Sequence, residues 1–301
     1  MSESDIFLAT SHPAVDSIPR QGPSYWKDAW LRLCQNKLAV CGLILLVIFI
    51  VMAIFVPILS PYTYYETHLS VKNTPPCTTY WFGTDELGRD LFTRIWWGAR
   101  ISLFVGVMAA VIDMVIGVLY GACAATFGGK VEEVMMRLAD IFYSLPHLLI
   151  VILLMVVMKS GLFTILLALT ITGWINMARI IRGQILQIKN NDFVMAAYML
   201  GANHMRVLFR HFIPNCIGPI VTTMTLTIPG AIFSEAFLSF LGLGVQAPLA
   251  SWGTMASDGL VALRYYPWRL LFPAGFISFT MLSFNLLGDG VRDSFDPRLR
   301  T

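Results

Sequence analysis

Long uncharged runs alternate with short charged stretches along most of the chain. A helix needs about 20 mostly apolar residues to cross a bilayer, and several of these runs reach or approach that length. They predict six membrane-spanning helices, at residues 38–56, 101–125, 141–158, 160–178, 212–241 and 270–288. The first helix is expected to end before Pro57, because proline interrupts the helical hydrogen bonds.

One further uncharged run, at residues 236–257, raises the question of a seventh span. The run contains Gly242, Gly244, Pro248, Trp252 and Gly253. We interpret these residues as breaking a helix, and we predict a non-cytoplasmic loop that can include a re-entrant turn. The preferred count of spans is therefore six.

The distribution of basic residues predicts the orientation and the organisation of the chain. With six spans, 14 Lys and Arg residues fall on the side of the N-terminus and 7 on the other side. Basic residues favour the cytoplasmic side, so both termini are expected in the cytoplasm. The expected segments are a cytoplasmic tail (1–37), a first span (38–59), an extracytoplasmic loop (60–99), a five-helix core (100–290) that includes a loop at 182–216, and a second cytoplasmic tail (291–301).

Composition supports an integral membrane protein and offers no sign of an enzyme. Hydrophobic residues make up 56% of the chain, charged residues make up 13%, and the mean hydropathy is +0.69. The five cysteines are scattered, without the spacing of a metal site or a disulfide framework. The motifs GxSxG, HExxH and GxxxxGK[ST] are missing from the sequence, so we expect no catalytic residue, bound metal or nucleic-acid partner.

A short apolar segment between the fourth and fifth predicted spans stands out. Asp192 is a favourable N-cap and Gly201 a favourable C′ residue, so the eight uncharged residues between them predict a helix. At about 1.5 Å per residue this helix is far too short to cross a membrane, and basic residues flank it on both sides. We interpret it as a docking element that a protein groove covers. The alternative is a helix on the lipid surface or against its own bundle.

Other polar features lie inside or beside the predicted spans. Asp113 and Glu235 are ionisable groups at membrane depth, where such groups usually face a cavity or a partner, and both are candidates for a translocation path or gate. The GxxxG pattern at 117–121 predicts close packing of helices within the chain. Arg137 and Asp140 are spaced for a local ion pair.

The loop that contains the short helix resembles the EAA loop of ABC-importer permeases. Ala196-Ala197, Gly201 and Ile213-Pro214 stand at the spacing of that motif. Two positions depart from it, since Met195 occupies the Glu position and His211 the first Ile position. The departure at Met195 puts a salt bridge through that Glu in doubt.

Three further stretches resemble the peptide/nickel branch of that family. They are FGTDELGRDLFTR at 82–94, FLSFLGLG at 237–244 with SWG at 251–253, and GDGVRD at 288–293 followed by DPR at 296–298. The chain is most similar to the second, C-type, permease of an oligopeptide or dipeptide importer. Nickel systems share much of the same pattern.

The resemblance implies an all-α permease of the type I importer fold, located in the inner or plasma membrane. Such a subunit pairs with a homologous permease as a heterodimer and receives peptide from an extracytoplasmic binding protein. Two cytoplasmic subunits use ATP and Mg, and this chain binds no cofactor. The residues implied in coupling to those ATPases are Met195, Ala196, Ala197, Gly201, Arg206 and Pro214.

Two other classes of protein remain as alternatives. A secondary transporter would need a driving-ion site and inverted repeats, and the sequence offers only Asp113 and Glu235 as candidate groups. A membrane enzyme or a structural scaffold is the second alternative.

Overall fold

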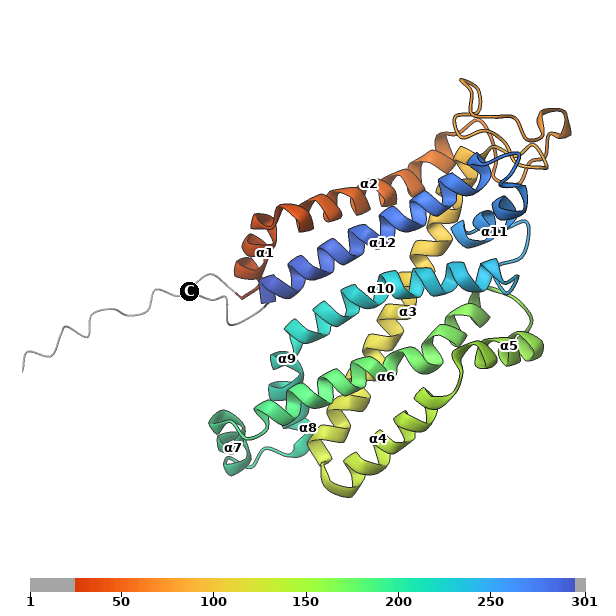
Figure 1. Cartoon of the computed structure of the whole chain (residues 1–301). Coiled ribbons are helices and arrows are strands. Elements are labelled where there is room, and N and C mark those ends of the chain that lie inside the picture. Colours follow the sequence, from red (N-terminus) through yellow and green to blue (C-terminus); the bar gives the residue numbers. More distant parts are fainter. Residues whose placement is uncertain (1–24, 296–301) are drawn as a thin grey trace, which may run out of the picture.

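The structure is a computed structural model that describes residues 25–295, and it is largely helical in that part of the chain (Figure 1). The longer helices are α1 (Tyr25–Gln35), α2 (Lys37–Leu59), α3 (Leu91–Phe127), α4 (Gly129–Ser144), α5 (His147–Met158), α6 (Leu162–Ile188), α10 (Ile217–Phe240), α11 (Trp252–Ala262) and α12 (Trp268–Phe295). The shorter helical segments are η2 (Leu69–Val71), α7 (Asp192–Met199), α8 (His204–Val207), η3 (Leu208–Phe212) and α9 (Ile213–Asn215).

The helices agree with six spans, one of which is bent. By length and composition, α2, α3, α6, α10 and α12 can each cross a membrane. The pair α4 and α5 makes a sixth span if the two count as one, but they meet at an angle of 79°. The break falls at Pro146, which caps α5 and disfavours a helical conformation at Leu145 before it. The third span predicted at 141–158 is therefore corrected to a broken span.

The first helix does not end before Pro57, and it continues to Leu59, the end expected for the first span at 38–59. Pro57 lies inside α2, where its missing N–H leaves the carbonyl of Ala53 without its helical partner. The guanidinium of Arg100 fills that place, because its Nε donates to the Ala53 oxygen at 2.6 Å. A proline is tolerated in a spanning helix where a neighbouring side chain satisfies the freed carbonyl.

Several predicted boundaries also move outward. α3 begins at Leu91 rather than 101, since Asp90 caps it by accepting from the backbone N–H of Thr93 at 2.8 Å, and the preceding loop is shorter than 60–99. α6 runs ten residues past the predicted end at 178, and α12 continues to Phe295. Charged side chains end an apolar run without ending a helix, which explains these errors.

Two segments outside the predicted spans are helical. α1 lies within the segment predicted only as a cytoplasmic tail (1–37), and it packs against α12, where Leu33 and Val291 share a small apolar cluster. α11 begins at Trp252 and Gly253, which were predicted to break a helix, because Ser251 and Thr254 form a capping box. The predictions for residues 1–24 and 296–301 lie outside the described residues.

The centre of the bundle is α3, which packs most extensively against α6 and also against α10 and α2. Gly117 and Gly121 allow the close contact with α6. A Cβ at Gly117 would lie 2.6 Å from the carbonyl oxygen of Trp174, and one at Gly121 would collide with Ala178. The GxxxG pattern thus serves packing within the chain, as predicted.

The molecule has two ends of different character (Figure 1). One end, called here the α7 end, carries α7, α8, α9 and the beginning of α4. The opposite end, called the α11 end, carries α11 and the loop at 60–90 between α2 and α3. The spanning helices connect the two ends.

Candidate functional site

The short helix α7 forms as the sequence predicts, with one shift at its start. Asn191 rather than Asp192 is the N-cap, and Asp192 is the first helical residue. Gly201 has φ of +82°, a left-handed conformation that favours glycine at C′. Its N–H donates to the carbonyl of Tyr198 at 2.9 Å. This turn ends α7 and directs the chain toward α8.

α7 has one face bound to the bundle and one face uncovered. Val194 and Ala197 are buried in an apolar cluster that includes residues of α3 and α6. On the other side the side chains of Met199 and Leu200 are 86% and 88% exposed, and Met195 is exposed as well. The helix is therefore anchored to the spans while it presents an apolar surface, here called the α7 surface, formed by Met195, Met199 and Leu200.

The segment after α7 is helical and has one buried and one exposed face. Asn203 caps α8 by accepting from the N–H of Arg206 at 2.8 Å. Val207, Leu208 and Phe212 are buried, whereas Arg206 is exposed. Exposed Pro214 stands at the start of α9, where a proline needs no helical N–H partner.

The structure separates the residues that the EAA-like motif brings together in sequence. Met195, Ala196, Gly201, Arg206 and Pro214 are exposed, whereas Ala197 is turned into the bundle. Met199 and Leu200, the most exposed apolar side chains of α7 and its C-cap, were not singled out from the sequence. The spacing of four between Met195 and Met199, which places both on one helical face, was a usable signal.

Two ion pairs connect the C-terminal part of α6 to α4 near the α7 end. Arg182 pairs with Glu132 of α4 at 2.6 Å, and Arg179 pairs with Asp140 of α4 at 2.7 Å. The predicted local pair between Arg137 and Asp140 is wrong, because the longer α6 brings Arg179 to Asp140.

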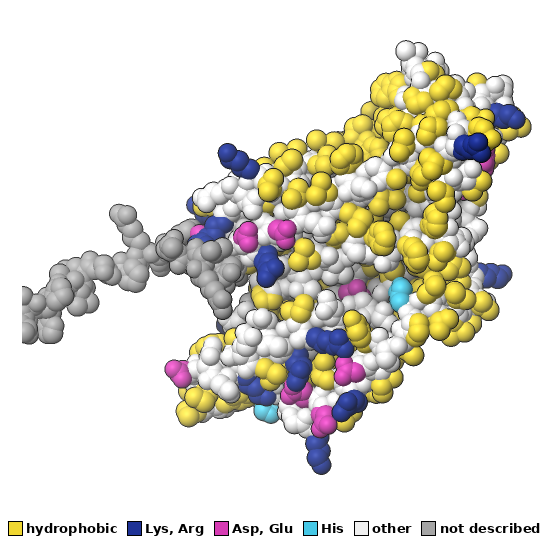
Figure 2. Space-filling model, in the orientation of Figure 1, with side chains coloured by type: hydrophobic (Ala, Val, Ile, Leu, Met, Phe, Trp, Pro, Cys, Tyr) yellow, Lys and Arg dark blue, Asp and Glu magenta, His cyan; other side chains and the backbone are white. Residues whose placement is uncertain are grey.

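A polar cavity of about 500 Å³ lies within the membrane-spanning part, among α3, α5, α6 and α10. Asp113 of α3 lines it and is only 5% exposed. Among the described residues, its Oδ1 has no hydrogen-bond partner. Figure 2 shows one face of the molecule, with hydrophobic side chains over much of its surface and many of the charged side chains toward the α7 end. The prediction that Asp113 faces a cavity agrees with this geometry, while a part in a translocation path stays a prediction.

Glu235, the other carboxylate at membrane depth, is packed inside the bundle. It is 0% exposed, and its two oxygens accept from Ser102 of α3 at 3.1 Å and from Ser239 at 2.8 Å. Ser102 also accepts from the N–H of Trp252 at the start of α11. Glu235 thus joins α3, α10 and α11, and the geometry does not support its predicted position facing an aqueous path.

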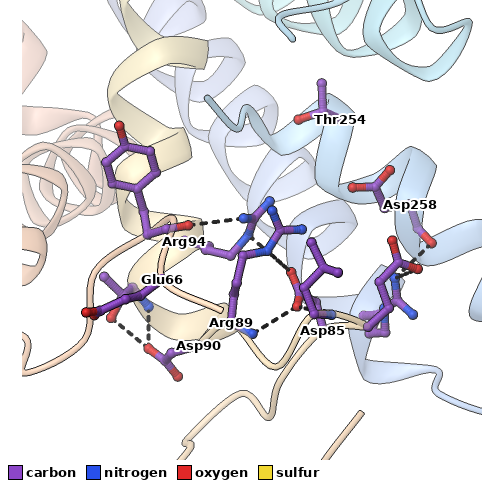
Figure 3. Close-up of polar contacts among 12 residues, drawn as sticks. Glu66, Asp85, Arg89, Asp90, Arg94, Thr254 and Asp258 are labelled. Atoms are coloured by element: carbon purple, nitrogen blue, oxygen red, sulfur yellow. Dashed lines mark hydrogen bonds and ion pairs between the residues drawn. The ribbon is translucent and has the colours of Figure 1, made fainter. Parts of the chain in front are cut away.

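The TDELGRD stretch forms a buried ion cluster at the α11 end (Figure 3). Asp85 accepts from the Arg89 guanidinium at 2.6 Å and lies 3.6 Å from that of Arg94. Arg94, itself 4% exposed, also donates to the carbonyl of Tyr64 at 3.1 Å. Figure 3 shows the two arginines side by side, with Thr254 and Asp258 of α11 across from them. The cluster fixes the loop at 60–90 against the start of α3.

A second arginine contact connects the same loop to α12. Arg269 donates to Asn73 at 3.2 Å and pairs with Glu86 at 3.1 Å. Burial raises the pKa of the Asp258 carboxyl, and nearby Arg94 opposes this effect. Burial also raises the pKa of Asp90, which the hydrogen bonds from Thr93 oppose. Among residues 25–295, the structure has no group of three or more His, Cys, Asp or Glu side chains placed to hold a metal.

Together these features define a polytopic helical membrane protein with a short helix held outside the spans and a polar cavity within them. The model of the family "Binding-protein-dependent transport system inner membrane component" matches residues 114–301. The chain belongs to this family of inner-membrane transport components. A second model, the "N-terminal TM domain of oligopeptide transport permease C", matches residues 24–76.

Relatives with assigned names are similar over almost their whole length. The chain is 61% identical over 95% of its length to an oligopeptide transport system permease protein OppC of Bacillus subtilis, of which it covers 94%. It is 57% identical, again over 95% of its length, to a dipeptide transport system permease protein DppC of the same organism, covering 90% of that protein. The OppC protein of Escherichia coli K12 is 44% identical, with 93% of each chain covered.

Solved structures share the fold. A chain of the MetNI methionine ABC transporter in an inward-facing conformation matches with a TM-score of 0.56 and 16% identity. The match covers 66% of this chain and 94% of that chain. A second crystal form of the same transporter matches similarly, with a TM-score of 0.55. At this identity the likeness concerns the fold alone.

Proposed function

We propose that this chain is a permease subunit of an ATP-driven importer that moves oligopeptides or dipeptides into the cytoplasm. The observation that carries the proposal is the α7 surface, an uncovered apolar patch on a helix that is anchored in the membrane core. The names of the 61% and 57% identical relatives support the substrate class. The chain itself performs no chemistry in this account.

The α7 surface suits a groove on a cytoplasmic ATPase. Exposed apolar side chains at the end of a membrane protein are stabilised when a partner removes them from water. The buried face of α7 is continuous with α3 and α6, so a displacement of α7 is passed to the spans. ATP-driven closure of a pair of ATPases can move the permease only through contacts that differ between its two states.

The remaining partners follow from the same scheme. A homologous permease completes the translocation path as the second half of a heterodimer. Two ATPase subunits, which bind ATP and Mg, dock on the α7 surface and on its counterpart, while this chain binds no cofactor. An extracytoplasmic binding protein delivers peptide at the α11 end. This arrangement places α7 and both termini in the cytoplasm, in keeping with the distribution of Lys and Arg.

The experiment that tests the proposal is peptide uptake by the reconstituted importer. Proteoliposomes that contain the two permeases, the two ATPases and the binding protein are given ATP and a radiolabelled tripeptide or dipeptide. Uptake should require ATP and every subunit. Transport by this chain without ATPases under an ion gradient would instead identify a secondary transporter, and full uptake without this chain would reject the proposal.

A further inference from the structure

The lining of the cavity beside Asp113 mixes apolar residues with polar ones, and the imidazole of His147 is among the polar groups. Six side chains with oxygen acceptors line it: Asp113, Thr172, Asn176, Thr223, Thr227 and Ser234. Among the described residues, no Lys or Arg lines this cavity. A ligand with several N–H donors and a positive charge matches such a wall, and an alkylammonium group has three donors and no acceptor.

The Asp113 carboxylate packs closely against α6, but no positively charged side chain pairs with it among the described residues. Gly173 of α6 lies directly against the carboxylate, and a Cβ at this position would collide with both carboxylate oxygens. The described residues offer no ion pair to Asp113 within 4.0 Å, and its Oδ1 is buried without a hydrogen bond. A buried carboxylate is costly unless a charge or a donor meets it.

Glu235 shows that this arrangement is not general for carboxylates in the bundle. Glu235 lies in the same membrane-spanning part and accepts from two serine hydroxyls. Asp113 instead lines the cavity, and among the described residues its buried Oδ1 has no such donor. The cavity is about 500 Å³, within the range of roughly 300–1,000 Å³ that is typical of small-molecule sites.

We propose that this cavity binds the ammonium group of a peptide and that Asp113 is its ionic partner. This inference rests on the proposed import of peptides and names the part of the substrate that the subunit contacts. The threonine, serine and asparagine side chains accept the remaining N–H donors. The same ammonium or guanidinium chemistry could come from a Lys or Arg of the homologous permease, and the experiment separates the two sources.

The test measures equilibrium binding of trialanine and of Nα-acetyl-trialanine by saturation-transfer NMR. The sample is the assembled permease–ATPase complex in nanodiscs, without binding protein. The wild-type complex should bind trialanine at least about tenfold more tightly than the acetylated peptide, as expected for a charged hydrogen-bonded pair. Asp113→Asn should remove this preference by weakening trialanine binding alone. Gly173→Ala, which displaces the carboxylate, should reduce the preference in the same direction.

Glu235→Gln is the matched control, because it neutralises a carboxylate of the same bundle that does not line the cavity. Per assembled complex, this variant should prefer trialanine over the acetylated peptide as strongly as wild type does. Equal binding of both peptides by wild type, no binding of either, or an equal effect of Asp113→Asn on both would overturn the proposal. A lower yield of the Asp113→Asn complex with an unchanged preference would mean that Asp113 pairs with a Lys or Arg of the homologous permease. This result would also overturn the proposal. Peptide uptake by the wild-type importer distinguishes failure of the ammonium site from failure of the proposed function. Uptake without a preference for trialanine in the binding assay rejects only the ammonium site. Absence of uptake of any peptide rejects the proposed function.

Discussion

The two ends of the molecule hold the segments outside the spans by different kinds of contact. At the α11 end a buried ion cluster holds the loop at 60–90, because Asp85 and Arg89 of the loop contact each other and Asp85 also lies close to Arg94 of α3. At the α7 end the chain leaves Met199 and Leu200 almost fully exposed. The α11 end also exposes apolar side chains such as Val261, so α7 is distinguished by being anchored through one apolar face while its other face is open to the proposed partner. Substitutions at the two ends should therefore damage different properties, stability at the α11 end and coupling at the α7 end.

The largest effect is expected from Asp85→Ala at the α11 end. The change leaves the Arg89 and Arg94 guanidinium groups buried without their carboxylate, which costs about 3–5 kcal/mol for a broken buried pair. Unfolding in mixed micelles measures the loss. Glu86→Ala is the neighbouring control, and it should cost less, since the Glu86 side chain is 57% exposed. Equal losses for the two variants would contradict the importance of the buried cluster.

Glu235→Gln should also lower stability, by about 1–3 kcal/mol, because a buried amide replaces an acceptor of two serine hydrogen bonds. The expected result is a lower yield of complex with unchanged uptake per assembled complex. This outcome reverses the expectation that the sequence supports, in which Glu235 faces the path. Reduced uptake per complex at normal yield would restore the earlier expectation.

A smaller loss of stability and a large loss of function are expected from Gly201→Glu at the α7 end. The positive φ of Gly201 costs a side chain about 1 kcal/mol. There is open space around the position, so the damage comes from the charge placed beside the α7 surface. Peptide-stimulated ATPase activity and co-purification of the ATPases should both fall. Gly201→Asn tolerates the same backbone conformation and should retain both, and a loss in the Asn variant would assign the effect to backbone strain.

The fold could be predicted from the sequence to the extent that hydrophobicity determines it. The six apolar runs located the spans because burial in lipid requires uncharged stretches of fixed length. The helix ends were missed, since Arg94 and Arg179 continue a helix beyond the apolar run and find partners in Asp85 and Asp140. The chain bends at Pro146 but continues as a helix through Pro57. At Pro57 the side chain of Arg100 satisfies the freed carbonyl of Ala53, and the sequence does not reveal such a contact between distant residues.

The candidate sites were predicted in part. The short apolar helix and its terminal glycine followed from local capping rules, and the structure places both where they were expected. The roles of Asp113 and Glu235 could not be separated by sequence, because each is a single carboxylate in an apolar run. Only the three-dimensional neighbours distinguish them, namely Gly173 and a cavity for Asp113 and the serines for Glu235.

The central claim, that the α7 surface docks an ATPase, is tested most directly by a photo-crosslinking residue at Met199 in the assembled importer. We expect a light-dependent crosslink from Met199 to an ATPase subunit, because this residue is 86% exposed on the uncovered face of α7. The same probe at Val194, on the buried face of the same helix, should crosslink only within this chain. Equal crosslinking to the ATPase from both positions, or none from Met199 in an ATP-hydrolysing complex, would contradict the claim.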